Sequence, residues 1–524
     1  MPAPLLAAVV LGLAPCGISA QTPQRGGTLE FGLAVEPPSY DCHAGNTFGV
    51  IFAVAPHYST LLKVDVKNYP NVVGDLAAAW DISPDRKTYR FRLQPNVLFH
   101  DGSRLTSADV KATYQRLRDP APGVVSVRQA LFAGITSIET PDSETVVFTL
   151  DEPDAAMLSL FASPWNCIYS AARLAQDPTF PATHIMGTGP FKFVEHAKGA
   201  YWVGARNETY FRPGLPYLDG FRITFIANET AMINALQGGA IKAEFRSITP
   251  IERDRLVDTL KDQIRIEETS ELTVQLLTFN VEHKPFDDPR VRRALSMAID
   301  RWDAGRGLGR TTRNKPVGGL MRPGSAMATP EAELSQLPGF GKDPAAARAA
   351  AKRLLADAGV SNLKFTLLNR NFAPNTQSGV YIVDQWRRIG VNAEHKPVEI
   401  AQWQQALTSG TFDAVVEFGS ALLDDPSFAM SKHISADRSP ANYSRAIDRE
   451  LDSLYDRQRR STGPEERLDA VRQFERRLYD QAYSVPFLWT QRIVPLYREV
   501  RGWSISPSLY IGQDLADVWL DNGH

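Results

Sequence analysis

The chain has 524 residues, 43% of them hydrophobic, so it can bury large cores, and a prior of about 150 residues per domain predicts two to four compact units. Its 57 basic residues nearly cancel its 59 acidic residues, and no long run of either sign occurs. This balance argues against a nucleic-acid-binding track and against a patch for anionic membranes.

Residues 1–20 have the pattern of an export signal. The stretch MPAPLLAAVVLGLAPCGISA contains no charged side chain, has an apolar core from Leu5 to Leu13 and ends in small residues. It is too short to span a bilayer, and no other apolar run reaches about 18 residues. We therefore expect cleavage near Ala20 and a mature chain in the periplasm, although only the terminal amine is positive ahead of the apolar core.

The cysteines leave two questions open. Cys16 stands in a sequence similar to a lipoprotein box, but Pro15 occupies the place of a small residue, so the sequence does not decide on lipid anchoring. Cys42 and Cys167 can pair in an oxidising compartment, and two buried free thiols are the alternative.

The segment FHDGSRLTSADV brings a histidine and two aspartates together, as a metal or acid–base site would. Before it, residues 87–99 alternate apolar side chains with arginines, which predicts a half-buried strand that ends in an Asp-Gly turn. Thr106 and Asp109 then form a capping box for a helix. Because His100 and Asp101 are adjacent on a strand end, their side chains point to opposite faces, so we interpret the segment as structural.

Motifs of catalysis are absent from the sequence. It contains no G-x-S-x-G, H-E-x-x-H or G-x-x-x-x-G-K-[ST], and no G-x-G-x-x-G that opens a helix. We predict no catalytic residues, no metal site and no cofactor, with a secreted hydrolase as the less favoured alternative.

The C-terminal half alternates strands and helices. Asp288-Pro289 and Asp343-Pro344 begin two helices, and then LKFTLLN, VNAEHKPVEI and FDAVVEF read as strands separated by the helices SGVYIVDQWRRIG and AQWQQALTSG. This alternation predicts parallel strands with right-handed crossovers. Ligands gather beyond the carboxyl ends of such strands, so residues 369–375 and 419–426 are candidate cleft loops.

Three blocks carry a family resemblance. Residues 74–116, 186–226 and 276–301 resemble, in order and spacing, the recurring blocks of the extracytoplasmic solute-binding proteins of family 5, which serve peptide and nickel ABC importers. The resemblance implies an α/β, two-lobed periplasmic binding protein (type II, cluster C-like) with an extra inserted α/β domain in the first lobe.

The same resemblance implies a division of the chain. The first lobe is expected to be discontinuous and the second lobe continuous. The expected segments are 26–60, 184–272 and 486–524 for the first lobe, 61–183 for the inserted domain, and 273–485 for the second lobe.

Two cleft loops suggest the chemistry of the ligand. Arg370 matches the arginine with which dipeptide-binding members hold the ligand's terminal carboxylate, and an arginine paired with its own lobe is the alternative. Leu422 stands where peptide-binding members present an aspartate to the ligand's amine. A leucine cannot offset the desolvation of an ammonium group, although a loop shift would let Asp424 substitute.

Other candidate contacts come from the first-lobe loop YDCHAGNTFG and from aromatic residues. In the loop, His43 is a candidate contact or axial metal donor, although a lone histidine is more often an ordinary hydrogen-bonded residue. The aromatic candidates can stack on a ring or sugar, and each is also a candidate for the core. The further candidates are Gly45, Asn46, Thr47, Trp403, Phe418, Gly419, Ser420 and Trp489.

We therefore predict a monomeric binding protein that captures a small solute between two lobes and delivers it to an ABC permease. The expected ligand has an acidic group and lacks a free peptide amine: an organic acid, a modified peptide or an acidic conjugate. An ordinary peptide or nickel-chelate binder is the alternative within the family, and a sensory role on the same fold stays open.

Overall fold

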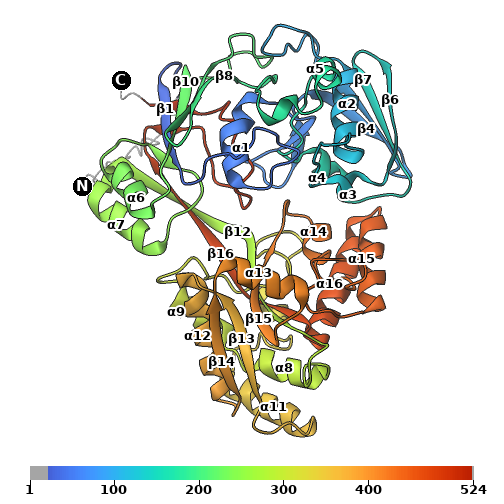
Figure 1. Cartoon of the computed structure of the whole chain (residues 1–524), viewed down its shortest axis with the longest axis vertical. Coiled ribbons are helices and arrows are strands. Elements are labelled where there is room, and N and C mark those ends of the chain that lie inside the picture. Colours follow the sequence, from blue (N-terminus) through green and yellow to red (C-terminus); the bar gives the residue numbers. More distant parts are fainter. Residues whose placement is uncertain (1–21, 522–524) are drawn as a thin grey trace, which may run out of the picture.

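The computed structural model describes residues 22–521 and shows two lobes joined by long strands (Figure 1). This confirms the predicted two-lobed α/β architecture. The expected export signal, with Cys16 and the cleavage position at Ala20, lies outside the described residues. Among the helices of residues 22–521, none combines the length and the apolar character that a bilayer crossing requires.

A single ten-stranded sheet runs through both lobes in the order β14-β13-β15-β12-β16-β11-β1-β10-β9-β8. Its fourth and fifth strands are the long antiparallel pair β12 (Ile264–Phe279) and β16 (Ser484–Tyr497), which pass from one lobe to the other (Figure 1). Their register shifts between Ser270 and Leu276, where the two lobes meet. The expected boundary at 272/273 therefore lies inside β12.

The first lobe is built on the half of this sheet that runs from β11 to β8. Strand β1 pairs in parallel with β10 and β11, and a large apolar core lies beneath them. The strands of this lobe are β1 (Thr28–Leu33), β8 (Phe191–Ala197), β9 (Tyr201–Arg206), β10 (Gly220–Phe225) and β11 (Ala243–Glu244), and its helices are α1 (Phe48–Val54), α6 (Glu229–Gln237) and α7 (Pro250–Leu260). A small ribbon of β17 (Val500–Arg501) and β18 (Trp519–Leu520) adds to it.

A second sheet forms the insert domain beside the first lobe (Figure 1). Its four antiparallel strands enclose a core of their own. They follow the order β4 (Ala77–Ile82), β5 (Thr88–Leu93), β7 (Thr145–Leu150) and β6 (Ile135–Asp142), next to the hairpin of β2 (Leu62–Val64) and β3 (Val72–Gly74) and the helices α2 (Ser107–Arg118), α3 (Gln129–Phe132), α4 (Met157–Phe161) and α5 (Ala171–Gln176).

The segment FHDGSRLTSADV has the structural role that we predicted. The carboxylate of Asp109 accepts from the Thr106 backbone N–H at 2.8 Å and closes the capping box of α2. The His100 Nε2 atom lies 3.0 Å from the Gly189 carbonyl oxygen, and Asp101 pairs with Arg173 at 3.1 Å. Within residues 22–521, no group of three or more His, Cys, Asp or Glu residues is arranged to hold a metal ion.

The second lobe confirms the predicted alternation. β13 pairs in parallel with β14 and β15, and the Asp288 and Asp343 carboxylates cap α8 and α11. The elements are α8 (Pro289–Met297), α9 (Arg301–Leu308), α10 (Glu331–Leu334), α11 (Pro344–Asp357), β13 (Lys364–Arg370), α12 (Ala373–Arg387), β14 (Asn392–Val398), α13 (Ile400–Ser409), β15 (Ala414–Ser420), α14 (Pro426–Met430), α15 (Arg449–Arg460) and α16 (Pro464–Gln481). α12 begins earlier than predicted, because Pro374 is favoured in the first turn of a helix.

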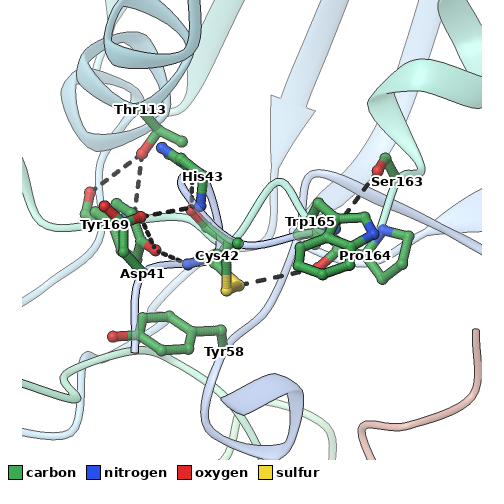
Figure 2. Close-up of a disulfide and its surroundings, with 12 residues drawn as sticks. Asp41, Cys42, His43, Tyr58, Thr113, Ser163, Pro164, Trp165 and Tyr169 are labelled. Atoms are coloured by element: carbon green, nitrogen blue, oxygen red, sulfur yellow. Dashed lines mark hydrogen bonds between the residues drawn. A yellow bond between two sulfur atoms is a disulfide. The ribbon is translucent and has the colours of Figure 1, made fainter. Parts of the chain in front are cut away.

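Cys42 and Cys167 form a disulfide, with their Cα atoms 6.1 Å apart (Figure 2). It joins the loop before α1 to the segment after α4 and so ties the first lobe to the insert domain. Beside it, the buried Asp41 carboxylate accepts from Arg116 at 2.6 Å and from the Tyr169 hydroxyl at 3.1 Å. The pairing that the sequence left open is therefore a covalent crosslink between two domains.

Candidate ligand-binding cleft

A cavity of about 680 Å³ lies where the lobes meet, a size typical of small-molecule sites. The first lobe contributes the start of α1, the segment after β11 and residues 507–510. The second lobe contributes the ends of β13 and β15, and β12 and β16 form the wall between them. The side chains used in the arguments below are Phe48, Glu229, Arg246, Glu271, Arg313, Arg370, Trp403, Phe418 and Ser420.

Arg370 is a charged side chain that the second lobe offers to this cavity from the end of β13. Its guanidinium carbon lies 5.5 Å from the ring centroids of both Trp403 and Phe418. Within residues 22–521, this side chain makes neither an ion pair nor a hydrogen bond. Burial lowers its pKa, but an arginine stays protonated at neutral pH. The aromatic faces hold the cation while its N–H edges remain available.

The first lobe offers a comparable group. The Arg246 guanidinium lies 4.5 Å from the ring centroid of Phe48, and it also has no ion pair or side-chain hydrogen bond within the described residues. Burial and the neighbouring Arg313 lower its pKa. Arg313 differs, because it pairs with the Glu271 carboxylate at 3.0 Å.

Several predicted contacts lie near this cavity in other roles. Trp403 lines it and donates from Nε1 to the Val416 carbonyl at 3.2 Å. Ser420 lines both this cavity and a smaller one of about 40 Å³, which Gly419 and Trp489 also line. The Trp489 indole donates to the Gly319 carbonyl at 3.0 Å.

Leu422 and Asp424, the two positions considered as partners for a ligand's amine, do not line the cavity. Leu422 is half-buried against the cores of the first lobe and the insert domain. Asp424 pairs with Arg322 at 2.6 Å, and each side chain is only 8% exposed. In this structure the pairing engages the Asp424 carboxylate with Arg322, and Asp424 does not line the cavity.

The residues predicted on the first-lobe loop 43–47 also lie outside the cavity lining. His43 is fully buried: its Nδ1 accepts from Arg116 at 2.9 Å, and its Nε2–H donates to the Cys167 carbonyl at 3.2 Å. Burial lowers its pKa to about 3. The disulfide and Arg116 therefore fix this histidine as a structural residue.

The rest of that loop supports α1. The Gly45 carbonyl accepts from Arg128 at 2.8 Å, Asn46 is exposed, and Thr47 is the N-cap residue of α1. The following residue, Phe48, is the one that reaches the cavity.

Sequence reasoning missed Arg246, Arg313 and Glu271. Arg246 comes two residues after β11, which is only two residues long, so its place beyond a strand end left no recognisable pattern. Glu271 lies in the irregular part of β12, where the alternation of side chains is interrupted. Phe48 could have been proposed as a cavity residue, because it lies in the loop 40–49 that the sequence indicated as a source of ligand contacts.

A second cavity, of about 320 Å³, lies between the insert domain and the C-terminal segment. Two of its cations are already paired: Lys63 pairs with Asp514 and Arg212 pairs with Asp75, each at 3.0 Å. The interlobe cavity, with two unpaired arginines and open aromatic faces, is the better candidate for recognising a ligand.

Comparison with known proteins identifies the family. The model for "Bacterial extracellular solute-binding proteins, family 5 Middle" matches residues 71–439, and the chain belongs to this family. It is 25% identical to "Probable di/tripeptide-binding protein 5" of Pseudomonas aeruginosa (strain UCBPP-PA14), over 96% of this chain and 97% of that protein.

Solved structures share the fold. The ABC transporter substrate-binding protein CtaP from Listeria monocytogenes superposes with a TM-score of 0.83 at 23% identity, over 95% of this chain and 100% of that one. AgaA from A. tumefacien R10, in complex with agropinic acid, superposes with a TM-score of 0.78 at 24% identity, over 95% of this chain and 99% of that one. The resemblance predicted from the three sequence blocks is therefore confirmed.

Proposed function

We propose that this solute-binding protein serves an ABC importer. As a monomer in the periplasm, it captures a small acidic solute between its lobes and hands it chemically unchanged to a membrane permease. The observation that carries the proposal is the unpaired guanidinium of Arg370 on the wall of the interlobe cavity. A planar guanidinium binds both oxygens of a carboxylate at once.

The ligand is expected to lack a free peptide amine. A buried ammonium needs a carboxylate partner, and neither Leu422 nor Asp424 supplies one to the cavity. Of the two acidic residues in the cavity wall, Glu271 already pairs with Arg313. An organic acid, an acylated or modified peptide, or an acidic conjugate fits these walls.

Ordinary peptides are the second candidate. They are supported by the relative in Pseudomonas aeruginosa, a probable di/tripeptide-binding protein, and by Glu229, an exposed cavity residue that forms no ion pair within residues 22–521. Burial and the neighbouring Glu252 raise the pKa of Glu229, and the nearby Arg313 and Arg246 would compete with a ligand ammonium for its charge. The fold alone does not choose, since it accommodates agropinic acid in AgaA.

Capture requires only that the ligand contact both lobes. To shift a hinge equilibrium from 1:99 to 99:1, a ligand must favour the closed form by about 5.5 kcal/mol. The long strands β12 and β16 connect the lobes, and we propose that the lobes move about their irregular part near residue 272. We propose the division into two lobes and an insert domain that the sequence predicted, except that β12 and β16 contribute residues to both lobes.

Titration calorimetry tests the ligand class. Aliphatic and aromatic acids are compared with di- and tripeptides on the wild type, Arg370→Gln and Arg222→Gln. Arg222 is the matched control, because its guanidinium stacks on Tyr201 at 3.6 Å and does not line the cavity. We expect R370Q to weaken an acid about 10- to 100-fold and R222Q to leave its binding unchanged.

Three further results bear on the alternatives. Tight binding of ordinary peptides would refute the proposal that the ligand lacks a free amine. Mass spectrometry of the ligand after incubation is expected to return the unaltered compound, and a hydrolysed product would indicate an enzyme. Nickel retained through purification would favour the chelate binder.

A further inference from the structure

The interlobe cavity contains the same arrangement twice, once on each lobe. On the second lobe, Arg370 rests against Trp403 and Phe418 with ring distances of 5.5 Å. On the first lobe, Arg246 rests against Phe48 at 4.5 Å. In both places an aromatic face holds the cation, and no carboxylate in residues 22–521 forms an ion pair with it, although the nearby Glu244 and Glu271 carboxylates attract Arg246.

The surroundings of Arg246 leave it available to an anion. Its backbone N–H donates to the buried Glu244 carboxylate at 3.0 Å, so Glu244 is engaged with the main chain. Arg492, which is fully buried, lies behind the same segment and donates to the carbonyl oxygens of Arg246, Phe245 and Ser506. Arg246 and Arg492 are thus two cations that share the attraction of Glu244 and Glu271, and neither forms an ion pair with them.

The acidic residues of the cavity do not cancel both arginines. Glu271 is held by Arg313 at 3.0 Å. Glu229 lies at the exposed rim, where burial and the nearby Glu252 carboxylate raise its pKa and the charges of Arg313 and Arg246 act in the opposite direction. The walls thus offer one arginine without an ion pair from each lobe, and the strands β12 and β16 pass between these lobes.

We propose that the ligand carries two acidic groups, one bound by Arg246 of the first lobe and the other by Arg370 of the second. This deepens the proposed function and rests on it. A ligand with one acid satisfies a single lobe, whereas a diacid contacts both lobes and so favours the closed form over the open one. Arg246 is therefore the residue that decides between acids with one and two charges.

Matched pairs of compounds test the inference. α,ω-Dicarboxylic acids of increasing length, aromatic diacids and N-acetylglutamate are each compared with their own monomethyl esters by titration calorimetry. At least one diacid is expected to bind about 10- to 100-fold more tightly than its ester. Small-angle scattering is expected to show a compact protein with that diacid and a more extended one with the ester.

Two substitutions complete the test. Arg246→Gln is expected to weaken the diacid to the level of the ester while it leaves the ester's own binding unchanged. Arg246→Lys keeps the charge but loses the planar fork, so it should fall between the two. Arg222→Gln is the control with an arginine on an aromatic ring elsewhere on the first lobe, and thermal unfolding confirms that each variant is folded.

The outcomes separate the two proposals. If single acids bind as tightly as diacids and R246Q has no effect while R370Q weakens binding, this inference is overturned and the proposed function stands. If peptides with free amines bind best and R370Q has no effect, both fail. A panel in which no diacid exceeds its ester overturns the inference whatever else binds.

Discussion

Arg322 donates two hydrogen bonds to the Oδ2 atom of Asp424, at 2.9 and 2.6 Å, and each side chain is only 8% exposed. The pair stands in the loop where a peptide binder would place the partner of the ligand's amine. Because this carboxylate is satisfied inside the protein, we expect the Arg322–Asp424 pair to contribute to stability rather than to recognition.

Asp424→Ala is expected to destabilise the protein without changing its ligand affinity. Removal of one member of a buried ion pair costs about 3 to 5 kcal/mol, since Arg322 is left buried and unpaired. Urea unfolding measures the loss, and calorimetry should show a change in affinity below about twofold. The double variant Arg322→Met/Asp424→Leu is the control that should regain most of the stability. A selective loss of affinity for amine-bearing ligands in D424A would show that the carboxylate reaches the cavity.

A contact between the lobes away from the cavity is expected to hold the molecule closed. Arg459 of α15 donates to the Asp154 carboxylate of the insert domain at 2.7 Å, and the Arg459 carbonyl accepts from the Ala155 N–H at 2.8 Å. The Asp154 side chain is only 9% exposed, so Arg459→Ala leaves it poorly solvated and without its partner. We expect the unliganded variant to be more extended in small-angle scattering and its ligand affinity to fall about fivefold.

The neighbouring residue provides the control for that experiment. Arg460 pairs with Glu152 at 2.7 Å, but these side chains are 57% and 54% exposed. Exposed pairs contribute little because water and salt screen them. Arg460→Ala should therefore leave both the shape and the affinity nearly unchanged, and equal effects of the two substitutions would argue against the specific role of Arg459.

The parts of the fold that the sequence predicted depend on local chemistry. The caps at Asp109, Asp288 and Asp343, and the alternation that forms β13 to β15, are set by residues close together in the chain. The same locality placed Arg370 at the end of a strand. Its aromatic neighbours, Trp403 on α13 and Phe418 on β15, could be proposed from the same strand–helix alternation.

Other features were set by residues far apart in the chain. His43 is buried by Arg116 and by Cys167, from two other elements, so its own neighbours in sequence carried no sign of its burial. Arg246 follows a strand of two residues that exists only because β1 and β16 flank it. Neither the burial of His43 nor the position of Arg246 follows from a periodic pattern in the neighbouring sequence.

The disulfide is expected to contribute strongly to stability. Cys42 and Cys167 close a loop with a sequence separation of 125, and loss of a crosslink over such a loop costs about 3 to 5 kcal/mol. The variant Cys42→Ala/Cys167→Ala should unfold at correspondingly lower urea concentration. Wild type treated with dithiothreitol is the matched comparison and should shift by a similar amount. An unchanged unfolding midpoint in both would contradict a formed disulfide.

Buried histidines predict how stability varies with pH. His57 is fully buried, donates from Nδ1 to the Phe191 carbonyl at 2.8 Å and accepts at Nε2 from the Trp202 indole at 2.9 Å. Burial lowers its pKa to about 3, whereas an unfolded chain has a histidine pKa of about 6.5. Between these values the unfolded state binds one proton more, so the stability from this group is complete above about pH 6.5 and is lost as the pH falls toward 3.

His57→Gln is therefore expected to flatten the pH dependence of stability. Each such histidine contributes a slope of about 1.4 kcal/mol per pH unit, and His43 and His433, whose pKa values burial also lowers to about 3, contribute to the wild-type slope as well. Urea unfolding at several values between about pH 4 and pH 6 should show a slope smaller by that one contribution in H57Q, besides a general loss of stability. His184, which is exposed, provides the control, and H184Q should keep the wild-type slope. An unaltered slope in H57Q would mean that His57 takes up a proton in the native protein. That result would contradict the hydrogen bond that its Nε2 accepts from Trp202.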